Sequence, residues 1–267
     1  MIVAVCSDKG SPGVTTLATV LSVVWPGERI LVEADPSGGD LSLRMHAPGT
    51  QYLAHEPTML SLAMAVRSGA VGGGLSGYAQ ATSLGIAVIP GPPVAEAWTP
   101  MLHLWTQVSA QIQVWPGTVI ADLGRLQPGH PGLPLVEAAD VVLLLAKTDV
   151  EGLFHARERA RDLTERTRGR VGVVVRAGSK DKNALSEIGQ VLHHLMPVIG
   201  SFADDPGGVK ALLEGSDTAH LRRSALMRSG VNLVARIQRA WPAPDARAPH
   251  SAPPQTGSPV RLLRDTR

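Results

Sequence analysis

The stretch Lys9-Gly-Ser-Pro-Gly-Val-Thr-Thr16 joins two segments of different character. The apolar segment before it, residues 2–6, is too short for a helix and is typical of a buried strand. After it, apolar residues follow the i, i+3, i+4, i+7 spacing of an amphipathic helix, at Leu17, Val20, Leu21 and Val24. A glycine-containing turn between a strand and a helix points backbone N–H groups at one spot. The stretch therefore predicts an anion site where nucleotide-binding α/β proteins keep their phosphate loop.

Apolar runs of strand length recur along the rest of the chain. They are residues 29–34, 84–89, 118–121, 141–146, 172–175 and 198–200. Segments with helical spacing separate them, and this alternation is the pattern of a parallel sheet covered by helices on both faces. We predict an α/β fold with a mostly parallel, twisted sheet.

Helical patterns are clearest at residues 58–67, 150–167 and 218–241, and a glycine-rich run at 69–77 suggests a mobile surface loop. After residue 241 the composition changes, because six of the last 26 residues are proline and apolar periodicity is lost. We predict one folded domain over residues 1–241 and a disordered Pro-rich tail over residues 242–267.

The composition limits the classes of function. The chain of 267 residues has a net charge of only +2, and its five Trp, two Tyr and two Phe are too scattered for a surface that stacks single-stranded nucleic acid. One cysteine, Cys6, excludes a disulfide framework and a Cys-rich metal site within the chain. The sequence starts without a basic leader and contains no apolar run of roughly 18 residues, so we expect a cytoplasmic protein without a transmembrane segment.

The phosphate-loop pattern lacks its lysine. Such a loop carries a lysine between its last glycine and the Thr pair, and this chain has Val14 there. A charged contact of this kind contributes on the order of 1.5–3 kcal/mol to binding. We therefore expect weak nucleotide binding or slow hydrolysis. The sequence alone also leaves open a second interpretation, in which the glycines only form a tight turn between the strand and the helix and bind no nucleotide.

On these residues the chain resembles the ParA/MinD family of deviant phosphate-loop ATPases, whose loop reads K-G-G-x-G-K-T-T or T-S. Five positions match and two depart, Ser11 and Val14. The resemblance implies ATP and Mg²⁺ as cofactors, bound by Lys9, Gly10, Ser11, Pro12, Gly13, Val14, Thr15 and Thr16. It further implies that Lys9 reaches the phosphates of the partner in a nucleotide-sandwich homodimer, and that Thr15 ligates the magnesium ion.

Two further segments carry the resemblance. Leu31-Val-Glu-Ala-Asp-Pro-Ser-Gly-Gly-Asp-Leu41 is similar to the family's switch I segment, and its Gly-Gly-Asp-Leu continuation is nearest to the CpaE/TadZ branch of pilus-assembly relatives. Val119-Ile-Ala-Asp-Leu-Gly124 is similar to switch II. The resemblance assigns catalytic roles to Lys9, Asp35 and Asp122, a water-mediated metal contact to Asp122, and sensing of the γ-phosphate to Gly124. Without the resemblance, Asp35-Pro36 also reads as an ordinary turn.

One departure concerns the base. Relatives often place an adenine-reading asparagine after the strand at residues 172–175, and this chain has Arg176 there. The preference for adenine is therefore open. The adjacent His193 and His194 point about 100° apart on a helix, so they cannot share a metal ion.

Three functions remain in competition. The first is a positioning or assembly protein that dimerises with nucleotide and recruits proteins of a pilus, secretion or cell-division apparatus, at the membrane or a cell pole. The second is a nucleotide-independent pseudo-ATPase scaffold. The third is a partition ATPase that contacts DNA through the arginines at 157–170 and 222–239, although alternating charges on a helix more commonly form a salt-bridged, solvated face.

Overall fold

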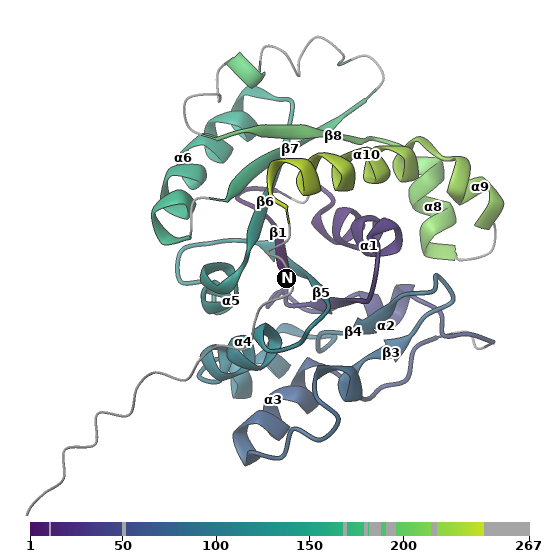
Figure 1. Ribbon diagram of the computed structural model, residues 1–267, viewed down its shortest axis with the longest axis vertical. Coiled ribbons are helices and arrows are strands. Elements are labelled where there is room, and N and C mark those ends of the chain that lie inside the picture. The colour runs from purple at the N-terminus through teal and green to yellow at the C-terminus, as the bar shows by residue number, and fades with distance from the viewer. Residues whose placement is uncertain are drawn as a thin grey trace, which may run out of the picture.

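The computed structural model describes residues 1–10, 12–49, 52–167, 170–178, 181, 188–190, 196–214 and 218–242. In this part of the chain one eight-stranded sheet has the order β3-β4-β2-β5-β1-β6-β7-β8 (Figure 1). The strands are β1 Ile2–Ser7, β2 Arg29–Glu33, β3 Gln80–Ala81, β4 Ala87–Ile89, β5 Thr118–Arg125, β6 Val141–Lys147, β7 Val171–Ala177 and β8 Val198–Ala203. All neighbouring strands pair in parallel except β3 and β4. The predicted α/β fold with a mostly parallel sheet is confirmed.

Helices cover both faces of the sheet (Figure 1). One layer contains α1 Val14–Val24, α8 Pro206–Glu214, α9 Thr218–Arg223 and α10 Ala225–Ala240. The other contains α3 Met59–Ser68, α4 Trp105–Gln113, α5 Leu133–Ala138 and α6 Val150–Arg166. A short helix, α2 Leu41–Arg44, and two 3₁₀ helices, η1 Leu75–Tyr78 and η2 Ala95–Met101, lie in the connections.

The two layers of core follow from the alternation of side chains along the central strand β1. Val3 and Val5 pack into the apolar layer beneath α1 and α10, whereas Ala4 and Cys6 pack into the layer beneath α3 to α6. Burial raises the pKa of the Cys6 thiol to about 12, so the thiol stays protonated. Cys6 is therefore a core residue rather than a reactive cysteine.

Several expected boundaries are corrected. The helix expected at 218–241 is broken, because the Ser224 hydroxyl accepts a hydrogen bond from the Met227 N–H at 3.1 Å and caps a new helix, α10. The strand expected at 84–89 starts later, since Gly85 has φ +74° and forms the turn between β3 and β4. The run at 69–77 is anchored by Leu75, which is buried in the core.

Other expectations fall outside what the structure describes. Residues 243–267 of the predicted tail, Ser11, His193 and His194 lie outside the described residues. Among the helices that are described, none is both long and apolar enough to cross a membrane.

Candidate phosphate-loop site

The phosphate-loop segment lies at the carboxyl edge of the sheet, between β1 and the start of α1. Gly10 and Gly13 have φ +73° and +101°, conformations that residues with a side chain rarely adopt. Gly13 is the N-cap of α1, and no described side chain caps this helix end. The backbone N–H groups of its first turn are thus available to an anion.

The side chain of Val14 belongs to the apolar core. Val14 is 5% exposed and packs in the apolar layer beneath α1. Beside the next two residues, Thr15 and Thr16, a cavity between α1, α2 and α8 has space for about 10 Å³, roughly one water molecule. Where a phosphate loop carries a lysine ammonium group, this chain thus has an apolar side chain that packs in the core.

Arg176 supplies a cation close to the loop. Its Nη1 donates to the Pro12 carbonyl at 3.2 Å, and its Nη2 pairs with Asp204 Oδ1 at 2.7 Å. A Cβ added at Gly13 would lie 3.9 Å from the same Nη1. The residue that stands at the adenine-reading position of relatives therefore lies against the loop itself.

Lys9 is exposed and lies against α6. Its Nζ is 3.4 Å from Nε2 of His155, and the other ring nitrogen of His155 is 3.4 Å from Asp8 Oδ2. Asp8 also forms an ion pair with Arg159, at 2.6 Å between Oδ1 and Nε. Charged side chains thus hold the start of the loop against the first turns of α6.

The two aspartates predicted from the switch segments meet above β5. Asp122 is fully buried inside β5, where its Oδ1 accepts the Gly124 N–H at 3.1 Å. Gly124 has φ +56°, and a Cβ built there would lie 1.9 Å from Asp35 Oδ2. Asp35 accepts the Ser37 N–H at 2.8 Å, which forms the turn expected from its sequence. The structure therefore brings Asp35, Asp122 and Gly124 together.

The environment of Asp122 raises the pKa of its carboxyl group. Burial raises its pKa to about 6, while the hydroxyl of Thr15 and the Gly124 N–H act in the opposite direction. Its Oδ2 is buried and has no hydrogen-bond partner among the described residues. An unpaired buried carboxylate oxygen beside a threonine hydroxyl fits a water ligand of a magnesium ion.

A buried glutamate that the motifs did not identify lies beside Asp122. Glu33 is the register partner of Asp122 across β2 and β5 and is 2% exposed. Its Oε1 accepts the N–H groups of Asp40 and Leu41, at 2.8 and 3.0 Å, and its Oε2 accepts that of Gly91 at 2.8 Å. Burial and the negative charge of Asp122 raise the pKa of Glu33 to about 7. The sequence did contain a signal for this buried carboxyl group, because Glu33 stands within the otherwise apolar segment at residues 30–34.

This raised pKa makes the stability depend on pH. Between about pH 4.5 and 7 the folded protein holds a proton on Glu33 that the unfolded chain has lost, so unfolding becomes easier as pH rises through this range. A carboxyl whose pKa moves from 4.5 to about 7 accounts for about 3 kcal/mol. We expect Glu33→Gln to flatten the decline in the free energy of urea unfolding between pH 5 and 8. Glu158→Gln, at an exposed position of α6, should keep the wild-type slope, and a wild-type slope in Glu33→Gln would contradict the assignment.

His130 completes the buried polar surroundings of the site. Its Nδ1 accepts the Gly132 N–H at 3.0 Å, which leaves the proton on Nε2, 3.1 Å from the Leu123 carbonyl. Burial lowers the pKa of His130, so the ring is neutral. By binding the backbone of both Leu123 and Gly132, His130 holds the segment that follows Gly124 in place.

The residues present fit magnesium and a polyphosphate in part. Among the described residues no group of three or more His, Cys, Asp or Glu side chains is arranged to hold a metal ion. Magnesium commonly binds through one or two protein groups plus phosphate oxygens and water, and Thr15 and Asp122 provide such groups. The N–H groups at the start of α1 fit a phosphate, whereas the missing loop lysine leaves its negative charge less compensated.

Comparisons with known proteins identify the fold. No family model and no curated protein matches the sequence. Among solved structures, the septum site-determining protein MinD with Mg-ADP from Pyrococcus horikoshii OT3 matches with a TM-score of 0.71 and 16% identity, over 90% of this chain and 96% of that one. A ParA family ATPase from Chlorobium tepidum matches with a TM-score of 0.70 and 16% identity, over 88% and 98% of the two chains. An ATP complex of a McdA variant from Cyanothece matches with a TM-score of 0.64 and 16% identity, over 90% and 95%.

These similarities extend over almost the whole of each related structure. Because the sequence identity is only 16%, they show a shared fold and nothing further. The chain therefore has the fold of the ParA and MinD ATPases.

Proposed function

We propose that the chain is a ParA/MinD-type positioning or assembly protein that binds ATP and Mg²⁺ weakly and dimerises with the nucleotide. The observation that carries this proposal is the convergence of the loop, Asp35, Asp122 and Gly124 at one edge of the sheet. In this proposal the loop N–H groups hold the phosphates. Thr15 and a water on Asp122 hold the magnesium ion, and Lys9 reaches the partner's phosphates.

The proposed partners are proteins of a pilus, secretion or division apparatus, which would recruit the dimer to a membrane or pole. Support for the CpaE/TadZ branch comes from the Gly38-Gly-Asp-Leu41 segment. A Cβ at Gly39 would lie 2.5 Å from Glu33 Oε2, and the N–H groups of Asp40 and Leu41 bind the same carboxylate. The segment thus needs its second glycine to close around Glu33.

A second candidate is a scaffold that dimerises without nucleotide. It is favoured by two observations. Val14 is buried in the core and supplies no cation to the loop, and Arg176 donates a hydrogen bond to the Pro12 carbonyl, so a protein side chain already lies against the loop. DNA binding has less support, because Arg159 and Arg166 of α6 form ion pairs with Asp8, Asp162 and Glu137.

Lys9→Ala separates the first two candidates. We expect ATP and Mg²⁺ to shift the wild-type protein from monomer to dimer in sedimentation velocity, and to leave Lys9→Ala monomeric, since the variant lacks the cation proposed to bridge the two subunits. Arg239→Ala, which removes an exposed cation from α10, should behave as wild type. Identical sedimentation of the wild-type protein with and without ATP would overturn nucleotide-linked dimerisation and favour the scaffold.

A further inference from the structure

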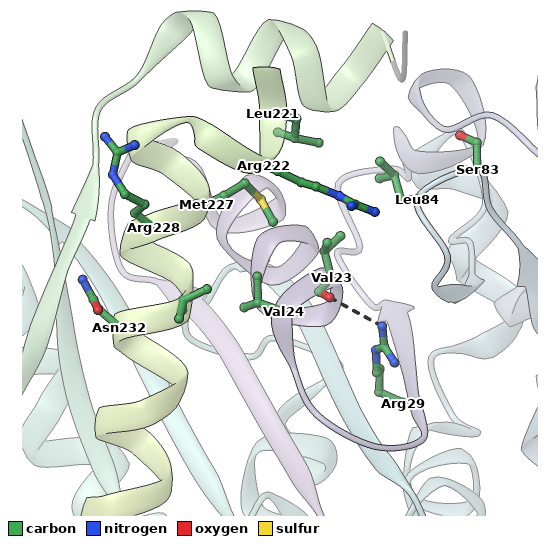
Figure 2. A pocket seen from close by; sticks show the side chains of 11 residues that line it. Val23, Val24, Arg29, Ser83, Leu84, Leu221, Arg222, Met227, Arg228 and Asn232 are labelled. Carbon is green, nitrogen blue, oxygen red and sulfur yellow. Dashed lines mark hydrogen bonds between the residues drawn. The ribbon is translucent and has the colours of Figure 1, made fainter. Parts of the chain in front are cut away.

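A pocket of about 610 Å³ lies beside the C-terminal end of α1 (Figure 2). Its walls come from the last turn of α1, the first residue of β2, the turn before β4, α9 and the start of α10. Because α1 runs from the loop at one edge to Val24 at the other, the length of this helix separates the pocket from the site described above.

The apolar part of the pocket is built from both helices and the turn. It consists of Val23, Val24, Leu84, Leu221, Met227 and Val231. Beside it α1 and α10 are in close contact, since a Cβ at Gly230 would lie 2.3 Å from Val20 Cγ1. The pocket is thus formed where two tightly packed helices diverge, and Val231 remains 55% exposed at its margin.

The charged part of the pocket is cationic. Arg29, Arg222 and Arg228 line it, and none of the described residues that line it is acidic. Arg29 is held in place by three backbone carbonyls, those of Ser22, Gly27 and Val23, at 2.9, 3.0 and 3.5 Å from its Nε, Nη1 and Nη2 (Figure 2). Because arginine carries five N–H donors, these three bonds leave two donors available to a ligand.

Arg222 is the cation best placed to meet a ligand. Figure 2 shows its side chain extending from α9 toward Leu84 and Val23. It is exposed, and no carboxylate in the described part of the chain pairs with it. An unpaired guanidinium above apolar side chains offers two different contacts to one molecule.

We propose that this pocket binds a small anionic amphiphile, a carboxylate or phosphate head group on a single apolar chain. The apolar side chains receive the chain of the ligand, and Arg222 and Arg29 bind its head group. The volume lies in the range of small-molecule sites, which is about 300–1,000 Å³. A bound peptide helix would instead need anchors spaced along a groove, so a free small molecule fits the single apolar patch beside the arginines better.

Titration calorimetry with monomeric decanoate tests this proposal and requires no nucleotide. We expect decanoate to bind, decanol to bind at least about tenfold more weakly, and the decyltrimethylammonium cation not to bind, because loss of a charged hydrogen bond costs on the order of 1.5–3 kcal/mol. Decyl phosphate in place of decanoate identifies the preferred head group.

Variants locate the binding. Arg222→Gln should weaken decanoate binding about tenfold or more, and Leu84→Asp should abolish it by placing a carboxylate among the apolar side chains. Arg239→Gln, at an exposed position of α10 outside the pocket, should bind as wild type. Equal affinity of Arg222→Gln and the wild-type protein for decanoate would overturn the proposal. So would flotation on phosphatidylglycerol vesicles that requires Arg222 without any binding of free decanoate, since it would assign the pocket to a membrane surface.

Discussion

Replacing Val14 with lysine is expected to raise the affinity for ATP about ten- to a hundredfold. Val14 is the first residue of α1 and packs in the core layer, so the aliphatic part of a lysine can keep these contacts while its ammonium group reaches the loop. A charge-assisted contact with phosphate is worth on the order of 1.5–3 kcal/mol, which sets the expected change in affinity. Calorimetric titration with ATP and Mg²⁺ measures it.

Val14→Met is the matched control for this substitution. It has an unbranched side chain without the charge, so it should leave the affinity near that of the wild-type protein. An unchanged titration and an unchanged rate of hydrolysis in Val14→Lys would count against a surviving nucleotide site in the loop.

Gly124→Ala is expected to lower the free energy of unfolding by about 2–4 kcal/mol. The alanine would have to adopt φ +56°, and its Cβ would overlap the carboxylate of Asp35. Displacement of Asp35 should also reduce whatever nucleotide affinity the wild-type protein has. Chemical unfolding and the same ATP titration measure the two effects.

Gly129→Ala is the control that measures the cost of backbone strain without an overlap of side chains. Gly129 has φ +76°, but a Cβ there meets no atom within 4 Å, so its substitution should cost only about 1 kcal/mol. In an Asp35→Ala background Gly124→Ala should then cost about as much as Gly129→Ala. If Gly124→Ala is equally costly with and without Asp35, the contact between the two residues is not the cause.

The sequence was sufficient for the fold class and for singling out Asp35, Asp122 and Gly124. Hydrophobic periodicity identified the parallel sheet. The motifs singled out Asp35, Asp122 and Gly124, which lie together, but the strand expected to end at residue 121 continues to Arg125 and includes both Asp122 and Gly124. The break at Ser224 was missed, since the apolar stripe continues across it and only the hydrogen bond of the serine reveals the cap. Strand β3 has two residues, too few for a periodic signal.

The polar surroundings of the site could not be predicted in the same way. The contact between Arg176 and Pro12 joins residues 164 positions apart, and the ion pair between Asp8 and Arg159 joins residues 151 positions apart. Such pairs depend on how the strand ends and helices are placed in space, which no local pattern encodes. Arg176 was noticed only as a departure at a base-reading position, and its place against the loop required the structure.

The hydrogen bonds of Glu33 connect the neighbourhood of the loop to a distant backbone amide, which offers a way to detect ligand binding. The Glu33 carboxylate accepts the backbone N–H groups of Asp40 and Leu41 and also that of Gly91, which lies 58 residues after Glu33 in the chain. The Gly39 N–H adds a bond to the Pro92 carbonyl at 2.7 Å. A ligand that displaces Asp35 would strain these joined segments, so the amide proton of Gly91 would act as a remote spectroscopic reporter of occupancy, readable in solution without a label on the nucleotide.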